Sequence, residues 1–261
     1  MSSQTPHAKK SLGQHWLNDE ASLEAMCQAA EVSKDDTVLE IGPGPGALTS
    51  KLVRQTGQVV AVEFDKRLAA ELPARVPADN LQVVAEDILS FDLASLPPDY
   101  KVVANIPYYL TSNLVRAISE TPNPPSLAAI LVQKEVAQRV AANPGAMSLL
   151  SVTAQFYWHT ELGRKVPAEF FTPPPKVDSQ ILVLRRRETP LFPEVDTKIF
   201  FRLAKAGFAQ RRKTLLNSLS GGLRLDRQQA AQILEKSGIE PSRRAQTLSL
   251  QEWHRLYENL D

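Results

Sequence analysis

The segment Val-Leu-Glu-Ile-Gly-Pro-Gly-Pro-Gly-Ala-Leu-Thr, residues 38–49, decides the fold of this chain of 261 residues. An apolar run typical of a buried strand leads directly into three glycines at alternate positions, Gly42, Gly44 and Gly46, and a helical pattern follows. Glycines at a strand-to-helix turn let the backbone approach a ligand closely, and the helix N-terminus offers unpaired N–H groups. The segment therefore predicts an α/β fold with a ligand at this turn.

A second apolar strand, Val59–Val62, ends in Glu63, 21 residues after Gly42. A carboxylate at this place suits the two hydroxyls of a ribose. The arrangement also fits the dinucleotide-binding fingerprint, because Ala47 can serve as its last small residue. A nicotinamide-dependent enzyme is therefore an alternative that these two strands leave open.

The next two strands favour S-adenosylmethionine as the ligand. Leu81–Ala85 ends in Glu86-Asp87, which places an acid where it can accept a hydrogen bond from an adenine amino group. The fourth strand ends in Asn105, so each of the first four strands delivers a polar or glycine-rich element at its carboxyl end, where open α/β sheets bind ligands. For Asp87 the alternative is a cap of the turn before Ile88.

The motif Asn105-Ile106-Pro107-Tyr108 suits a flat base that carries an amino group. An exocyclic amine such as adenine N6 is a poor nucleophile because its lone pair is delocalised into the ring. The Asn105 side-chain oxygen and the Ile106 carbonyl can accept hydrogen bonds from that amine and localise the lone pair. Pro107 makes a stiff turn, and the Tyr108 ring can stack on the base. The alternative is an ordinary Asn-x-Pro turn.

The order of elements predicts a mostly parallel sheet. Strands are expected near 37–41, 58–62, 81–85, 101–105 and 127–132, and helical patterns alternate with them. Segments 155–166 and 179–186 are expected to close the sheet as a hairpin with an antiparallel edge, and the loop from Pro167 to Lys176 is expected to border the target pocket. A helix is expected at 19–31, after a mobile N-terminal segment at 1–18. After Pro190 the pattern becomes helical, so we expect one domain at 1–187 and a helical domain at 188–261.

Composition excludes several classes of protein. The single cysteine, Cys27, excludes an internal disulfide and every site in which several cysteines bind a metal, and no metal is expected. No apolar run approaches the ~20 residues of a membrane-spanning helix, and nothing resembles a signal peptide. These features predict a cytoplasmic enzyme without a membrane partner.

Positive charge is concentrated in the last part of the chain. The whole chain carries a net charge of +1, but residues 185–261 hold 15 Lys and Arg against 9 Asp and Glu, which gives +6 there and −5 for residues 1–184. The basic residues form clusters at 185–187, 211–213 and 243–244, with Lys9-Lys10 near the other end. Such clusters can follow nucleic-acid phosphates; the alternative is a set of solvated helix faces.

The chain resembles the ribosomal RNA adenine N6-dimethyltransferases, and within them the KsgA type that acts on 16S rRNA. The resemblance extends over nearly the whole length, and its blocks are Lys10–Leu17, the glycine segment, Glu63, Asp87, Asn105–Tyr108, Gln133–Arg139, Phe171–Ser179 and Phe208–Asn217. The first block is similar to the family's Gly-Gln-(Asn/His)-Phe-Leu signature. Two departures are Trp16, where the family usually has Phe, and Met147–Leu150, which lacks the usual Tyr-Gly.

The resemblance implies a role for individual residues. The residues that it assigns to the cofactor are His15, Leu17, Gly42, Gly44, Glu63, Asp87 and Asn105. Asn105 would contact both the cofactor and the target amine, and Tyr108, with Phe171 opposite, would sandwich a flipped-out adenine. For His15 the alternative is a solvated side chain near a terminus. For Phe171 it is a core aromatic beside a proline-rich loop, which the sequence alone favours.

The resemblance also implies a fold, an activity and a partner. The fold would be a Rossmann-like class I methyltransferase with a seven-stranded sheet and a small C-terminal helical domain. The enzyme would transfer methyl groups from S-adenosylmethionine to N6 of two adjacent adenosines in the hairpin near the 3′ end of 16S rRNA, within an immature small ribosomal subunit. It would act as a monomer, without a metal or a nucleophilic residue.

Three alternatives besides the dehydrogenase remain open at this point. One is the large-subunit rRNA methyltransferase type that confers macrolide resistance, whose N-terminal signature and helical domain match less well. A second is a DNA adenine methyltransferase, although no separate DNA-reading domain is evident. The third is a non-catalytic RNA-binding assembly factor, against which the presence of the cofactor residues argues.

Overall fold

The structure is a computed structural model that describes residues 8–9 and 12–260. Lys10 and Ser11, which begin the N-terminal signature, and residues 1–7 of the segment expected to be mobile lie outside the described residues. The chain forms two compact units. One contains the residues up to Ala137 together with His159–Arg186, and the other contains Gln138–Trp158 and the residues from Arg187 onward.

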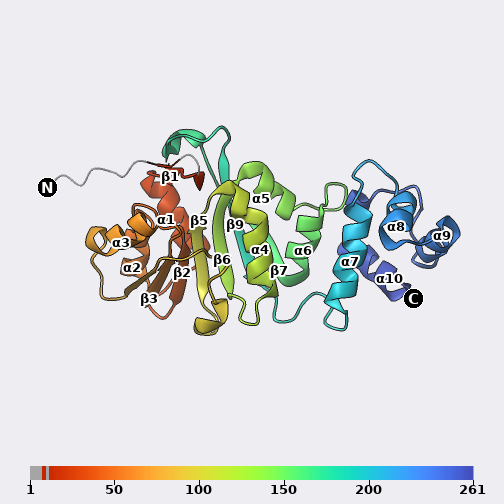
Figure 1. The fold of residues 1–261 in the computed structure, drawn as a ribbon, viewed down its shortest axis with the longest axis horizontal. Helices are drawn as coiled ribbons and strands as arrows, with labels where there is room; N and C mark the ends of the chain where they lie inside the picture. The colour runs from red at the N-terminus through yellow and green to blue at the C-terminus, as the bar shows by residue number, and fades with distance from the viewer. Residues whose placement is uncertain (1–7, 10–11, 261) are drawn as a thin grey trace. The chain divides into compact units, whose positions relative to one another are not determined.

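A seven-stranded sheet forms the frame of the first unit (Figure 1). Its strands are β2 (Thr37–Ile41), β3 (Gln58–Val62), β4 (Leu81–Val84), β5 (Lys101–Asn105), β6 (Leu127–Gln133), β7 (Trp158–Val166) and β9 (Ser179–Arg186). They lie in the order β4-β3-β2-β5-β6-β9-β7. The first five strands pair in parallel and β9 runs antiparallel to β6, so the predicted mostly parallel sheet with an antiparallel edge is confirmed.

Continuous apolar runs explain why the central strands lie inside. Residues 127–132 of β6 are all buried, as expected for a parallel strand that is covered on both faces. The helices of this unit are α1 (Glu20–Ala29), α2 (Thr49–Gln55), α3 (Lys66–Arg75), α4 (Thr111–Glu120) and α5 (Lys134–Val140), of which the last continues beyond the unit. One core cluster joins α1 and α2 to the sheet, with Leu23 and Met26 from α1 and Leu52 from α2.

A short two-stranded sheet holds the end of the N-terminal segment. Strand β1 (Trp16–Leu17) pairs antiparallel with β8 (Phe171–Thr172), so that Leu17 lies opposite Phe171. Both of these side chains are buried in the core cluster. Residues 16–17 are therefore fixed by pairing and burial, which differs from the expectation of a mobile segment up to residue 18.

The second unit is helical. It contains α6 (Leu149–Tyr157), α7 (Thr197–Phe208), α8 (Leu215–Leu223), α9 (Arg227–Lys236) and α10 (Leu250–Glu258), with a short 3-10 turn at Ala245–Thr247. In the first unit, 3-10 turns include Leu93–Ser95, Tyr108–Leu110 (η3) and Ala168–Phe170. Its own core gathers around Phe200 and Trp253, both of which are fully buried.

The two units divide at 186–187, one residue before the expected boundary at 187–188, but the helical unit also includes an earlier segment. Residues 138–158 belong to the helical unit, and residues 155–157, expected in the hairpin, end helix α6. The physical reason lies in α6 itself. Ser148 and Ser151 form a capping box that starts the helix, and the apolar side chains of Val152 and Phe156 are buried in the second core.

Candidate functional site

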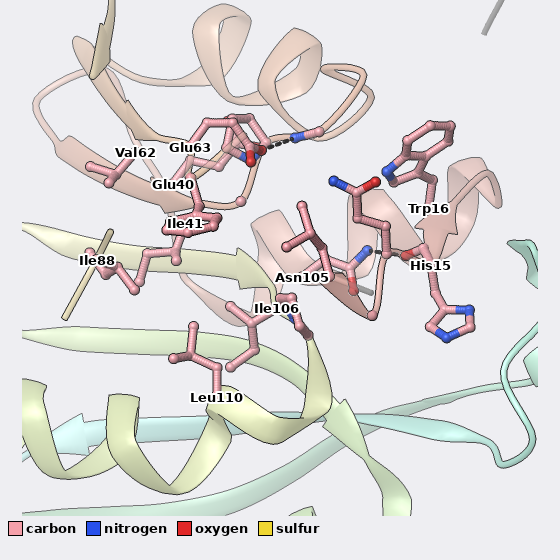
Figure 2. A pocket seen from close by; sticks show the side chains of 18 of the residues that line it. His15, Trp16, Glu40, Ile41, Val62, Glu63, Ile88, Asn105, Ile106 and Leu110 are labelled. Atoms are coloured by element: carbon pink, nitrogen blue, oxygen red, sulfur yellow. Dashed lines mark hydrogen bonds between the residues drawn. The ribbon is translucent and has the colours of Figure 1, made fainter. Parts of the chain in front are cut away.

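A cavity lies at the carboxyl ends of β2, β3, β4 and β5 (Figure 2). Its lining contains every predicted site residue except Phe171, namely His15, Leu17, Gly42, Gly44, Glu63, Asp87, Asn105, Ile106, Pro107 and Tyr108. The structure therefore brings together residues that lie up to 93 positions apart in the sequence. Parallel strands explain this for the residues from Gly42 to Tyr108, because their carboxyl ends meet at one edge of the sheet. His15 and Leu17 come from the N-terminal segment, which pairs with β8.

The glycine loop and Glu63 form one wall of the cavity. Gly42 and Gly44 have φ values of +67° and +56°, a region in which glycine is favoured. The Gly44 N–H donates to Oε2 of Glu63 at 3.0 Å, and the Asp65 N–H donates to Oε1 at 2.8 Å. Burial raises the pKa of Glu63, against the effect of these bonds. Each carboxylate oxygen can accept further hydrogen bonds, so a ligand hydroxyl can still be held here.

Asp87 caps a turn and also lines the cavity. Its Oδ1 accepts a hydrogen bond from the Leu89 N–H at 3.0 Å, which is the turn cap. No bond to Oδ2 occurs within the described part of the chain. One oxygen thus fixes the turn, and the contact of the other with a ligand stays a prediction.

Asn105 occupies the tip of β5, where the cavity turns toward Tyr108. Its Nδ2 donates to the backbone carbonyl of His15 at 3.3 Å. Ile106 is buried, and Pro107 accepts a hydrogen bond from the Leu110 N–H at 3.0 Å, which starts turn η3. The arrangement presents the Asn105 amide at the cavity surface on a stiff support.

Tyr108 is anchored at its hydroxyl end. The hydroxyl lies 2.8 Å from Oγ of Ser179, which is fully buried at the start of β9. Burial raises the pKa of this phenol, so the hydroxyl stays protonated at neutral pH. The ring is thereby held in one orientation at the cavity wall.

Residues 12–17 supply a further wall. A methyl group placed on Gly44 would lie 3.2 Å from Cδ1 and Nε1 of Trp16, so this indole packs against the glycine loop. His15 Nδ1 lies 2.7 Å from the carbonyl oxygen of Pro173, and the imidazole is stacked near the Tyr108 ring, with centroids 6.1 Å apart and planes at 18°. Trp16, which departs from the family pattern, is thus a cavity residue that the sequence reasoning had not assigned.

Phe171 lies apart from the cavity lining. Its side chain is 3% exposed and belongs to the core cluster, where its strand pairs with that of Leu17. The alternative interpretation of Phe171, a core aromatic beside the proline-rich loop, describes this position. In this structure the ring opposite Tyr108 belongs to His15.

Glu40 is a second residue of this site that sequence reasoning missed. It lines the cavity, is only 1% exposed, and neither of its carboxyl oxygens has a hydrogen-bond partner among the described residues. Burial raises its pKa to about 8, and the charge of Glu63 adds to this, whereas the nearby hydroxyl and backbone N–H of Thr49 oppose it. The sequence signal for this residue is an acid inside the apolar run at 38–41, because burying a carboxyl without a partner is costly and a functional reason for it is therefore expected.

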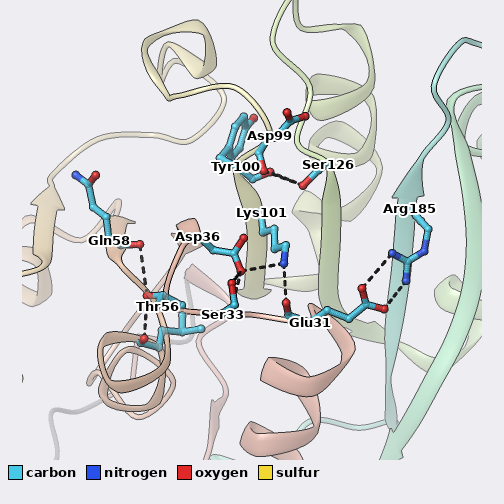
Figure 3. A network of polar contacts seen from close by, with 11 residues as sticks. Glu31, Ser33, Asp36, Thr56, Gln58, Asp99, Tyr100, Lys101, Ser126 and Arg185 are labelled. Atoms are coloured by element: carbon cyan, nitrogen blue, oxygen red, sulfur yellow. Dashed lines mark hydrogen bonds and ion pairs between the residues drawn. The ribbon is translucent and has the colours of Figure 1, made fainter.

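The basic clusters differ in whether their side chains form ion pairs with acidic residues. Arg186 pairs with Asp99, which lies just before β5. Arg185 pairs with Glu31 at 2.7 Å, in a polar network around the amino end of β5 (Figure 3). This network lies at the opposite end of β5 from Asn105. The first two residues of the cluster at 185–187 therefore each have an acidic partner, and their contact with phosphates stays a prediction.

Two further basic residues of the clusters are also paired with acidic side chains. Lys9 pairs with Asp65 at 2.7 Å, and Arg243 pairs with Glu252; Lys10 lies outside the described residues. The cluster at 211–213 is exposed, and no ion pair joins it to an acidic side chain in the part of the chain that the structure describes. This cluster keeps its charge available for a partner.

The described residues contain no group of three or more His, Cys, Asp or Glu side chains that could hold a metal ion. No helix among them combines the length and the apolar character that crossing a membrane requires.

The chain is similar to known proteins over nearly its whole length. It matches the family described as Ribosomal RNA adenine dimethylase over residues 6–261. It is 42% identical to Ribosomal RNA small subunit methyltransferase A of Dehalococcoides mccartyi strain 195, over 98% of this chain and 89% of that protein. It is 38% identical to the protein of the same name from Staphylococcus haemolyticus, over 96% of this chain and 89% of that protein.

Solved structures agree with this likeness. A dimethyladenosine transferase from Plasmodium falciparum has a TM-score of 0.80 at 25% identity, with 93% of this chain and 96% of that chain covered. The 23S rRNA methyltransferase ErmE has a TM-score of 0.74 at 31% identity, with 94% and 99% covered. The fold of the first unit is thus that of the class I methyltransferases.

Proposed function

Because the chain belongs to the ribosomal RNA adenine dimethylase family, we propose that it transfers methyl groups from S-adenosylmethionine to N6 of two adjacent adenosines near the 3′ end of 16S rRNA. The product is N6,N6-dimethyladenosine. The observation that carries this proposal is the meeting of two half-sites in one cavity. The glycine loop, Glu63 and Asp87 form one half, and the Asn105 tip forms the other.

The residues of the first half-site fit this cofactor. S-adenosylmethionine carries positive charges on its sulfonium and on its amino group, and the buried Glu40 carboxyl lacks a partner that a cation would supply. Glu63 suits the ribose hydroxyls, and Asp87 suits the adenine amino group. A dinucleotide fits less well, because its negative pyrophosphate would lie at a loop flanked by two buried carboxyls, Glu40 and Glu63. This contrast argues against the dehydrogenase alternative.

When bound, the cofactor supplies a methyl group that is already activated by the positive charge on sulfur. The chain's own residues then have a positioning task. Tyr108 stacks on the target adenine, while Asn105 Oδ1 and the Ile106 carbonyl accept hydrogen bonds from its amine. These acceptors bind more strongly as the amine becomes tetrahedral and positive, which favours the transition state over the ground state. The proton then leaves to water.

The small subunit is favoured over the large subunit as the substrate. The relatives named for the small subunit are 38% and 42% identical to this chain, whereas the large-subunit enzyme ErmE is 31% identical. The free basic cluster at 211–213 supports RNA contact by the helical unit. We place the reaction in the cytoplasm, on an immature small subunit, with one copy of the chain as the active form.

The test is methyl transfer from radiolabelled S-adenosylmethionine to unmethylated small subunits, with large subunits and DNA in parallel, followed by nucleoside analysis. The proposal expects N6,N6-dimethyladenosine from the small subunit alone. Label on large-subunit rRNA would indicate the large-subunit methyltransferase type that confers macrolide resistance, and label on DNA would indicate a DNA methyltransferase. Tight subunit binding without any label would favour the non-catalytic assembly factor.

A further inference from the structure

We propose that Lys9 and Asp65 are positioning residues for cofactor binding, and that they act as an ion pair through Glu63. This inference rests on the proposed function, because it concerns how the residue assigned to the ribose hydroxyls is held. Neither Lys9 nor Asp65 lines the cavity, so neither touches the ligand itself. Lys9 thereby receives a role that differs from the phosphate contact expected for the Lys9-Lys10 cluster.

The Asp65 carboxylate is buried at the start of helix α3. Its side chain is 3% exposed, and its Oδ1 caps the helix by accepting from the Arg67 N–H at 3.1 Å. Its Oδ2 lies 2.7 Å from Nζ of Lys9, and apart from this ion pair the atom has no partner among the described residues. Lys9 lowers the pKa of Asp65, against the effect of burial. Removing the Lys9 charge would leave a buried carboxylate without compensation, which is costly.

The backbone of Asp65 holds the Glu63 side chain. The Asp65 N–H donates to Oε1 of Glu63 at 2.8 Å, and the Gly44 N–H donates to Oε2 at 3.0 Å. These two bonds orient a buried carboxyl group at the cavity wall. A shift of residue 65 that brought its unpaired carboxylate to water would withdraw one of the two donors. The orientation of Glu63 therefore depends on the ion pair of Asp65.

The charges of the two acids also act on each other. Burial is the main reason why the pKa of Glu63 is raised, and the negative charge of Asp65 adds to the rise. Lys9 neutralises Asp65 and so reduces the repulsion that an ionised Glu63 meets. An ionised carboxylate accepts hydrogen bonds more strongly than a neutral carboxyl group. The Lys9 charge thus favours the form of Glu63 that suits ribose hydroxyls.

The backbone of Lys9 is bonded to residues that line the cavity. Its N–H donates to Oε1 of Gln14 at 2.7 Å, and its carbonyl accepts from the Leu12 N–H at 3.0 Å. Gln14 and Leu12 both belong to the cavity lining. The Lys9 ammonium is therefore held beside Asp65 by residues that border the ligand. Cofactor binding and formation of the ion pair should favour each other, because such coupling is reciprocal.

The experiment measures cofactor binding by calorimetry and methylation kinetics on small subunits for Lys9→Met, Lys9→Arg and the unchanged protein. Methionine removes the charge and keeps most of the side-chain length. We expect Lys9→Met to weaken S-adenosylmethionine binding by about 5- to 50-fold, within the range of coupling between linked sites. The KM for the cofactor should rise by a similar factor, whereas kcat at saturating cofactor should stay within about twofold. Lys9→Arg should restore most of the affinity because it restores the charge.

Two further variants separate positioning from a general loss of stability. Lys51→Met is the matched control, because it removes a lysine whose ion pair, with Glu20 at 2.8 Å, does not involve Glu63 or Asp65. It should leave cofactor affinity within about twofold, since no bond to Glu63 depends on it. Asp65→Asn keeps a side chain that caps a helix but carries no charge. In that background, Lys9→Met should change cofactor affinity by less than about twofold.

The outcomes separate the inference from the proposed function. An unchanged protein that binds S-adenosylmethionine but methylates no small subunit would overturn the proposed function, while the binding comparison would still decide the inference. Equal cofactor affinity of Lys9→Met and the unchanged protein would overturn the inference alone. So would a Lys9→Met protein whose KM rises for the subunit and not for the cofactor, because this result would assign Lys9 to phosphate contact. An equal loss with and without Asp65→Asn would show that Lys9 acts without Asp65, which also overturns the inference.

Discussion

The backbone N–H of Gly44 donates to Oε2 of Glu63 at 3.0 Å, and this bond ties the glycine loop to the end of the neighbouring strand. The other oxygen of Glu63 accepts from the Asp65 N–H at 2.8 Å, at the cap of helix α3. One buried carboxylate therefore fixes the glycine loop and the start of helix α3, and it is the same side chain that we propose for the ribose hydroxyls.

A Glu63→Gln protein should lose cofactor affinity and some stability. The amide has one acceptor oxygen in place of two, so one of the two backbone N–H groups would be left unpaired. We expect a loss of about 10- to 100-fold in cofactor affinity, and a fall in the free energy of unfolding of about 1–3 kcal/mol. Calorimetry and denaturant unfolding measure the two effects. Glu120→Gln, which breaks an exposed pair with Arg116, is the control and should change neither quantity appreciably. Unchanged cofactor binding by Glu63→Gln would refute the ribose assignment.

Glu40 should make the stability of the ligand-free protein depend on pH. Its pKa is about 8 in the folded protein, against an ordinary value of 4.5. Between these values the unfolded chain has released the proton while the folded protein still binds it. The free energy of unfolding therefore falls as pH rises, by at most about 1.4 kcal/mol per unit, and this decline ends above the folded pKa. The free energy of unfolding of Glu40→Gln, measured in urea from about pH 5 to 8.5, should depend less on pH than that of the unchanged protein. Equal pH dependence in the two proteins would contradict the raised pKa of Glu40.

The same carboxyl should release a proton when the cofactor binds. A cation beside Glu40 lowers the pKa of the carboxyl, so binding near pH 7 should displace part of the proton that the ligand-free site holds. Calorimetric titrations in buffers with different heats of ionisation count the released protons. We expect release by the unchanged protein and none by Glu40→Gln. Equal proton release by both proteins would place the cofactor's positive charge elsewhere.

The sheet and the cavity follow from local sequence signals. The apolar runs before Gly42 and Glu63 end where the strands end, and parallel pairing brings these ends to one edge. The predicted site residues from Gly42 to Tyr108 line one cavity for this reason, and His15 and Leu17 join it through the N-terminal segment. Strand ends can be recognised from the chain alone because burial of a parallel strand leaves a continuous apolar run.

Features that depend on contacts between distant segments were not predictable in the same way. Phe171 lies in the core because its strand pairs with Leu17, 154 positions earlier. Arg185 pairs with Glu31, also 154 positions away, which no local pattern indicates. The role of Glu40 was likewise hidden, because the absence of a partner around its carboxyl is a property of the folded interior.

Asn105→Ala should abolish methyl transfer and leave RNA affinity largely intact. The amide contributes an acceptor at the reacting amine, and removal of one such preorganised group costs on the order of 10²- to 10³-fold in rate. Affinity for the subunit depends mainly on phosphate contacts elsewhere. Single-turnover methylation and filter binding to small subunits measure the two quantities. Full activity of Asn105→Ala would remove this residue from the chemistry.

The two basic clusters should differ in their effect on RNA binding. Replacing Arg211, Arg212 and Lys213 together with alanine should weaken subunit binding and reduce the slope of log affinity against log salt, by about 2 to 3 if all three contact phosphates. Replacing Arg185 and Arg186 is the matched comparison, because both already pair with acidic side chains. That protein should keep the salt dependence of the unchanged chain. Equal losses in the two proteins would show that pairing does not withdraw residues 185 and 186 from RNA.

The adjacent glycines of α8 should respond in opposite directions to the same substitution. A methyl group on Gly222 would lie 2.6 Å from Cβ and 2.8 Å from Cα of Ala206, so Gly222→Ala must push α8 away from α7. We expect it to lower the free energy of unfolding by about 1–3 kcal/mol. A methyl group on Gly221 meets nothing within 4 Å. Gly221→Ala should therefore raise stability by about 0.5–1 kcal/mol, because alanine loses less backbone freedom in a helix.

Denaturant unfolding of the full chain, followed by far-ultraviolet circular dichroism, distinguishes the two glycine variants. Each serves as the control for the other, because both change the same residue type in the same helix. Effects of the same sign would contradict the close approach of α7 and α8 at Ala206. The sequence pair Gly-Gly cannot show which glycine faces the neighbour, since both read equally well as the end of a helix. Only the packing of α8 on α7 makes one of them necessary and the other replaceable.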